Sequence, residues 1–144
     1  MDLLVLGSGI AGLSAAIHAA QRGWTVGVVT KGALATSATH YAQGGVAAAL
    51  GAPDSVDLHR ADTLTAGAGL CDADAVSVLV SEGPRRVREL IALGAQFDER
   101  NGELELAIEG GHSLPRVVHA GGDVEIIYLF EKSFFEKLFI LSFS

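Results

Sequence analysis

Three glycines near the N-terminus have the spacing of a turn that binds the diphosphate of a dinucleotide. Gly7, Gly9 and Gly12 form a G-x-G-x-x-G pattern between a short apolar run and an alanine-rich stretch. In such a turn the first glycine permits a sharp bend, the second lets a diphosphate approach the backbone, and the third lets helix and strand pack closely. The helix N-terminus then offers N–H groups and a positive dipole end to the phosphates. The predicted contact residues are Gly7, Ser8, Gly9, Ile10, Ala11 and Gly12.

The elements that must position this turn are short and well marked. Asp2–Leu6 reads as a buried strand, Gly9–Arg22 as a helix that ends at Gly23, and Thr25–Thr30 as a second buried strand. A strand, a crossover helix and a strand in so short a stretch form a βαβ unit, which requires a parallel sheet. The sequence therefore predicts an α/β fold with a Rossmann-like βαβ unit, against the alternative of a purely structural glycine turn.

The end of the second strand departs from the usual nicotinamide pattern. A carboxylate normally binds the ribose hydroxyls there, whereas this chain has Thr30 and Lys31. Either the cofactor is held differently from NAD, or the family uses another pair of residues. A plain NAD-dependent domain remains the alternative.

A long run of small residues follows, from Lys31 to Pro53, with A-Q-G-G at residues 42–45. Loops of that length without their own secondary structure usually bind something. Small residues let the backbone lie along a flavin ring, and backbone N–H groups can bond the ring nitrogens and carbonyls. This segment therefore favours a flavin over a nicotinamide.

Five motifs occur in order along the chain: G-S-G-I-A-G-L-S-A-A, T-K-G, T-H-Y-A-Q-G-G-V-A-A, D-T-L-T-A-G-A-G-L-C-D and E-G-G-H-S. Together they resemble the L-aspartate oxidase branch of the fumarate reductase/succinate dehydrogenase flavoproteins, and the likeness runs from residue 2 to about Asp123. The resemblance implies oxidation of L-aspartate to iminoaspartate with FAD, which oxygen or fumarate would reoxidise. The alternatives are a soluble flavoprotein of the fumarate reductase type and a partial flavin-binding module without catalysis. The product would feed quinolinate and NAD biosynthesis, with quinolinate synthase as a partner.

The resemblance also implies how the flavin is held. The family places Ser or Thr followed by Lys at the position of Thr30 and Lys31. In membrane-associated members a histidine in the loop carries FAD covalently, but that register falls on Ala38 here, and His40 lies two residues away. A tightly bound, non-covalent FAD is expected. The further predicted contacts are Thr30, Lys31, Ala38, Thr39, His40, Tyr41, Ala42, Gln43, Gly44 and Gly45.

Glu109 is the candidate substrate residue. From the residues alone, E-G-G-H-S at 109–113 reads equally well as a solvated turn. L-Aspartate oxidases have a glutamate at this place that faces the substrate amino group, so the resemblance implies that Glu109 distinguishes aspartate from succinate by an ion pair. His112 and His119 either line the site or are structural. No catalytic residue is predicted within this stretch.

Composition excludes several classes of protein. The 144 residues suffice for one ordinary domain, and a formal charge of −7 argues against a nucleic-acid partner. Cys71 stands alone, which suits a reducing compartment, and the cytoplasm is the predicted location. No metal-ligand spacing and no signal peptide are present.

The middle of the chain predicts helices and strands that support the loops. Ser55 is expected to cap one helix, Asp72 or Asp74 to cap a second through Glu82, and Pro84 to begin a third. Residues 102–108 alternate as in a half-exposed strand. Asp62 reads as an ordinary helix-end or loop carboxylate.

The tail from residue 124 to 144 differs from the rest, because it holds five of the six phenylalanines and neither Gly nor Arg. We divide the chain into residues 1–123, the N-terminal part of an FAD-binding domain, and 124–144, a divergent tail from a truncation or frameshift. The alternative is an amphipathic terminal helix through Ile127, Phe130, Phe134 and Leu138. Charges within the tail argue against a membrane span. Because the family's other substrate-binding residues come later, the chain is expected to be inactive alone.

Overall fold

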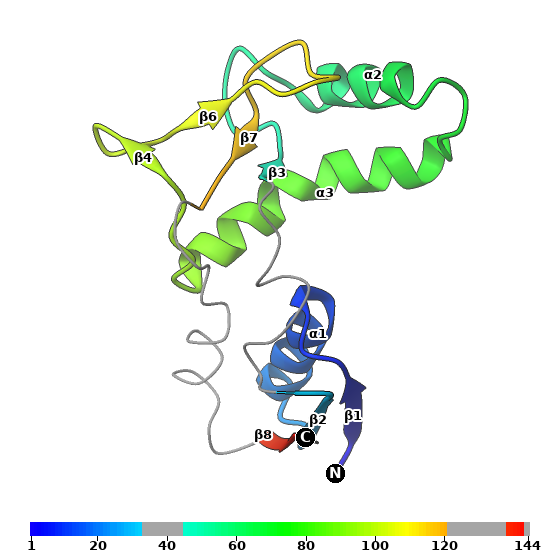
Figure 1. Ribbon diagram of the computed structural model, residues 1–144, viewed down its shortest axis with the longest axis vertical. Coiled ribbons are helices and arrows are strands. Elements are labelled where there is room, and N and C mark those ends of the chain that lie inside the picture. Colours follow the sequence, from blue (N-terminus) through cyan, green and yellow to red (C-terminus); the bar gives the residue numbers. More distant parts are fainter. Residues whose placement is uncertain (33–44, 121–137, 143–144) are drawn as a thin grey trace. The chain divides into compact units, whose positions relative to one another are not determined.

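A computed structural model describes residues 1–32, 45–120 and 138–142, and it divides into two compact units (Figure 1). Residues 1–43 and 123–144 belong to the first unit, and residues 44–122 to the second. Each unit has its own sheet and its own apolar cluster. The two units are therefore described one at a time.

The first unit opens with the expected βαβ arrangement. Strand β1 (Leu3–Leu6) leads to helix α1 (Ile10–Gln21) and then to strand β2 (Val26–Thr30). The two strands are parallel, with Leu3 opposite Val26. The α/β class and the parallel βαβ unit are thus confirmed.

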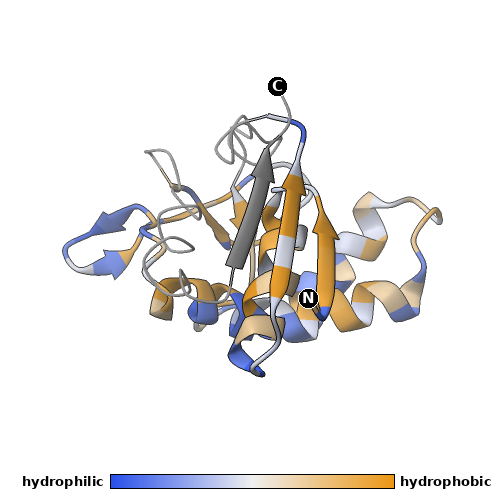
Figure 2. Ribbon diagram, turned by 90° about the horizontal axis from the view of Figure 1, so that it is seen from below, coloured by the Kyte–Doolittle hydropathy of each residue, from blue (hydrophilic) through white to orange (hydrophobic). Residues whose placement is uncertain are grey.

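One face of this sheet packs against α1. Val5, Val26 and Val28 form a buried cluster with Leu13 and Ile17 of the helix. Burying side chains of this size contributes about 1.5–3 kcal/mol each. In Figure 2 the strand that leads from the N-terminus is coloured as hydrophobic. This packing fixes the position of the β1–α1 turn.

Strand β8 (Leu138–Ser142) is the third strand of the sheet. It pairs parallel to β2, with Val26 opposite Leu138 and Thr30 opposite Ser142. The alternative of a terminal helix is therefore wrong at Leu138, which lies in a strand. An apolar run of L-F-I-L is typical of a strand in a parallel sheet. The other positions of that helix lie outside the described residues.

The second unit contains short antiparallel strands. Strands β3 (Val46–Ala47) and β6 (Leu106–Ala107) flank β7 (Val117–Val118). Strands β4 (Glu99–Arg100) and β5 (Glu103–Leu104) form a separate hairpin.

The expected strand over residues 102–108 is wrong as a single element. The chain is divided between β5 and β6, and the N–H of Glu105 between them donates to the carbonyl of Asp98 at 2.8 Å. Asn101 and Gly102 both have positive φ angles of 57° and 82°, as a two-residue hairpin turn requires. The alternating pattern indicated a strand from residue 102, but that residue lies in the turn of the β4–β5 hairpin.

Two helices support the strands of the second unit. Helix α2 (Val56–Ala66) begins after Ser55, whose side chain accepts from the N–H of Leu58, as expected. Helix α3 (Ala73–Ala92) begins after Asp72, whose side chain accepts from the N–H groups of the first turn. Both predicted caps are confirmed.

Pro84 does not begin a third helix, because it lies inside α3. The buried positions Val76, Val80, Pro84 and Val87 follow one another at spacings of three or four residues, so they share one face. Proline within a helix costs about 3 kcal/mol through a lost hydrogen bond and a ring clash. Burial of these four side chains along one face of α3 offsets that cost. The local sequence around Pro84 did not indicate that the helix continues through it.

Candidate functional site

The glycine turn of the first unit has the backbone that its spacing predicted. Gly7 follows β1 with a φ of 106°, a conformation that side chains disfavour, and its N–H donates to the carbonyl of Val29 at 2.8 Å. Gly9 then caps α1 in an extended conformation without any side-chain cap bond. The helix N-terminus is thus left without a side-chain acceptor from its own cap.

Gly12 lies where the helix approaches the turn most closely. A Cβ atom built there would be 2.4 Å from the carbonyl oxygen of Gly7 and 3.1 Å from Cγ1 of Val5. Any side chain at residue 12 would therefore push α1 away from the turn. The close helix–strand packing expected for the third glycine is present, and this backbone fits the diphosphate of a dinucleotide.

The hydroxyl groups of Ser8 and Thr30 join the turn to the end of β2. Their Oγ atoms lie 3.0 Å apart, and both residues are buried. The Thr30 hydroxyl, predicted to bond ribose, thus already bonds Ser8, although a hydroxyl can accept a further hydrogen bond. Lys31, the other predicted residue, is exposed just after the strand. Contact of either with a ribose remains a prediction.

Most of the predicted flavin-facing segment lies outside the described residues, which include only its last member, Gly45. The undescribed predicted contacts are Ala38, Thr39, His40, Tyr41, Ala42, Gln43 and Gly44. In the second unit, a Cβ built on Gly45 would be 2.3 Å from Cγ1 of Val117 and 2.8 Å from Nε2 of His119. The end of the A-Q-G-G segment therefore lies against the His119 ring.

Glu109 is paired with that same histidine. Its Oε1 lies 2.8 Å from Nε2 of His119, with side chains 49% and 34% exposed respectively. The structure thus brings the predicted substrate residue next to the end of the predicted flavin segment, through a histidine whose role the sequence left open. The pair is also accessible to a ligand.

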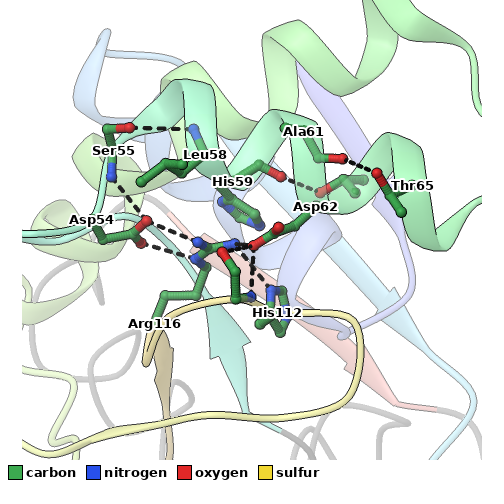
Figure 3. A network of polar contacts seen from close by, with 11 residues as sticks. Asp54, Ser55, Leu58, His59, Ala61, Asp62, Thr65, His112 and Arg116 are labelled. Atoms are coloured by element: carbon green, nitrogen blue, oxygen red, sulfur yellow. Dashed lines mark hydrogen bonds and ion pairs between the residues drawn. The ribbon is translucent and has the colours of Figure 1, made fainter.

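A buried arginine holds the E-G-G-H-S loop beside α2 (Figure 3). Arg116 is fully buried, and its Nε and Nη2 donate to the two oxygens of Asp54 at 2.9 and 2.8 Å. Its Nη1 donates to Asp62 at 2.6 Å and lies 3.3 Å from Nδ1 of His112. Burial opposes the charge of Arg116, but the hydrogen bonds to Asp54 and Asp62 outweigh it and raise the pKa of Arg116.

Asp62 is a corner of this network, so its interpretation as an ordinary carboxylate is wrong. It also accepts from the backbone N–H and the hydroxyl of Ser113, at 2.8 and 2.7 Å. These bonds, together with those from Arg116, lower the pKa of Asp62 to about 2. The only signal in the sequence was Arg116 directly before two valines, because a charge buried beside apolar residues demands carboxylate partners.

Two histidines border the network. The rings of His59 and His112 meet edge to face, with centroids 5.6 Å apart. His59 is buried, and its Nδ1 has no hydrogen-bond partner among the described residues. Burial and the charge of Arg116 lower the pKa of His59. His112 is therefore part of this network, and a role in lining the site stays a prediction.

Among the described residues, no group of three or more His, Cys, Asp or Glu could hold a metal ion. In the same part of the chain, no helix is both long and apolar enough to cross a membrane.

Comparisons with known proteins agree with the geometry. A family model described as an FAD binding domain matches residues 2–135. The chain is 57% identical over 123 residues to an L-aspartate oxidase of Streptomyces coelicolor, which covers 85% of this chain and 21% of that protein. It is 55% identical over 120 residues to a chloroplastic L-aspartate oxidase of Arabidopsis thaliana, covering 83% of this chain and 18% of that protein.

The fold is also similar to that of a chain in a solved complex. The apo form of the Mycobacterium smegmatis Sdh1 complex superposes with a TM-score of 0.86 at 32% identity, over 98% of this chain and 27% of that one. The chain thus spans about a fifth of the length of the curated relatives named above.

Proposed function

The chain belongs to the FAD binding domain family, whose cofactor is FAD, and we propose that it is the N-terminal part of a flavoprotein that oxidises L-aspartate to iminoaspartate. The observation that carries the proposal is the glycine turn, where residue 12 has no room for a Cβ and residue 7 has a positive φ. The similarity to proteins named L-aspartate oxidase supports the choice of substrate.

The first unit holds the dinucleotide in this proposal. The backbone at Gly7, Gly9 and Gly12 receives the diphosphate, while Thr30 and Lys31 lie toward the ribose. When bound, FAD supplies the acceptor for the two electrons removed from the amino acid. The contacts proposed for residues 38–45 hold it without a covalent bond.

Glu109 recognises the ammonium group of the substrate. A carboxylate attracts an ammonium group that succinate lacks, so Glu109 favours aspartate over a plain dicarboxylate. Oxygen or fumarate as the final electron acceptor, quinolinate synthase as the consumer of the product, and a cytoplasmic location remain parts of the proposal.

The short span shared with the relatives limits what this chain does alone. We propose that residues 1–123 bind FAD without turning over aspartate, and that residues 124–144 are a divergent ending. Reading the DNA after codon 123 in all three frames tests that division. A continuation that begins Ala-Thr-Gly in another reading frame supports the division. If only the present reading frame continues without a stop codon, the result argues against it.

Titration of the purified chain with FAD tests the cofactor site. We expect the wild type to quench FAD fluorescence and Gly12→Ala to weaken binding by about fivefold to 150-fold, because strain of about 1–3 kcal/mol enters the turn. Gly51→Ala is the matched control, since nothing lies within 4 Å of a Cβ there.

Far-UV circular dichroism and the fluorescence of Trp24 report whether each variant is folded. The proposal is contradicted if the folded wild-type chain does not bind FAD, or if it binds NAD in place of FAD. Bleaching of bound FAD by aspartate shows instead that this chain is active alone.

A further inference from the structure

The ring of His119 in the second unit is bordered on two sides, by Glu109 and by the backbone at Gly45. Its Nε2 contacts Oε1 of Glu109 at 2.8 Å. The backbone of the same residue is also fixed, because its carbonyl accepts from the N–H of Asp98 at 2.7 Å. On another side the backbone at Gly45 lies so near that a Cβ would be 2.8 Å from Nε2 and 2.8 Å from the carbonyl oxygen of Val118. The ring therefore has little freedom to turn away from Glu109.

The chemistry of the pair fixes the position of one proton. An ionised carboxylate only accepts hydrogen bonds, so Nε2 of His119 must carry the proton that it shares with Glu109. Among the described residues, no second side-chain hydrogen bond reaches this carboxylate. One oxygen is thus occupied by the imidazole N–H of His119, and the other stays available to a cation.

We propose that His119 is a positioning residue that orients the Glu109 carboxylate toward the substrate ammonium group, and that residue 45 is glycine to leave room for its ring. The proposal rests on the function proposed above and deepens it. A free glutamate side chain loses rotamer freedom when it binds a ligand, and a fixed partner removes part of that cost before binding.

The effect is expected in affinity for aspartate alone. Immobilising one side chain costs about 0.5–1.5 kcal/mol, so losing the donor should weaken aspartate binding by about twofold to tenfold. Succinate has no ammonium group for Glu109, and its affinity should stay unchanged. A purely structural role for His119 would weaken both ligands equally.

The test uses the full 144-residue chain saturated with FAD. Two variants replace His119 by side chains of similar length. His119→Gln keeps an N–H near the position of Nε2, whereas His119→Met removes it. His18→Met, at an exposed histidine of α1, is the matched control. Chemical-shift changes of the Glu109 amide are followed while L-aspartate or succinate is added.

We expect the wild type, His119→Gln and His18→Met to prefer aspartate over succinate to the same extent, and the preference of His119→Met to be smaller by about twofold to tenfold. An unchanged preference in His119→Met overturns the role of His119 and leaves the proposed function standing. A wild type that responds equally to both ligands overturns the proposed function together with this inference.

A second measurement needs neither cofactor nor substrate, so it remains decisive if a variant fails to fold. Nitrogen–proton correlation spectra of the histidine rings in the wild-type chain should show His119 with a proton on Nε2. A proton on Nδ1 instead would exclude the hydrogen bond to Glu109 and overturn the inference.

Discussion

Replacing Arg116 by methionine is the sharpest test of the structure, because it removes a fully buried charge and preserves much of the volume. The change deletes the bonds of 2.9 and 2.8 Å to Asp54 and of 2.6 Å to Asp62. The Asp54 carboxylate, whose side chain is 4% exposed, is left buried without its charged partner. Breaking a buried ion pair in this way costs about 3–5 kcal/mol, a large part of the about 5–15 kcal/mol that stabilises a domain.

Arg86 provides a matched control with similar contacts but different burial. It donates three hydrogen bonds of 3.2, 2.8 and 2.9 Å to Glu82 and Glu89, yet its side chain is 46% exposed. Exposed pairs contribute about 0–1 kcal/mol, so Arg86→Met should barely change the free energy of unfolding.

Urea unfolding followed by far-UV circular dichroism, which reports on α2 and α3, measures both variants. Adding Asp54→Asn to Arg116→Met should recover part of the loss, because the stranded charge disappears, so the two changes are not additive. The reasoning is refuted if Arg116→Met costs no more than Arg86→Met, or if the double variant is as unstable as the sum of the single changes.

Two further predictions concern pH and a helix cap. The pKa of buried His59 is lowered, so the unfolded chain binds its proton more readily, and the free energy of unfolding should fall as pH drops below about 6.5. Because the pKa of Asp62 is lowered to about 2, a second loss of unfolding free energy should follow between pH 3.8 and 2. Urea midpoints at pH 7, 5 and 3 measure both losses. A midpoint that does not change with pH would contradict the prediction. Ser55→Ala removes the cap of α2 and should lower the free energy of unfolding, measured by thermal unfolding, by about 1 kcal/mol. Ser81→Ala, within α3, is the control and should lower it by less. Equal losses in the two variants would contradict the capping role.

The βαβ part of the first unit could be predicted closely because its signals are local. A strand, a turn, a helix and a second strand follow one another within residues 3–30, and each boundary has its own residue. The positive φ of Gly7 and the close approach at Gly12 are consequences of that short connection. Side-chain caps at Ser55 and Asp72 were predictable for the same reason, since a cap acts within three residues.

Prediction failed where a long-range contact overrode a local preference. Pro84 has the local signature of a helix start, but it continues α3 because residues on the same face are buried on either side of it. The strand expected over residues 102–108 is interrupted because Glu105 bonds back to Asp98 across the hairpin. In both cases packing and pairing decided between conformations that the local residues allow.

The sequence by itself determined the βαβ unit, its glycine turn and the residue types available for binding. Only the tertiary structure decided that Arg116 pairs with Asp54 and Asp62, which are 62 and 54 residues away, and that the His119 ring lies between Gly45 and Glu109. The physical reason is that neighbouring residues choose backbone conformation through local sterics and capping. A buried charge instead finds its partner through the way whole elements pack, and no short window of residues contains that information.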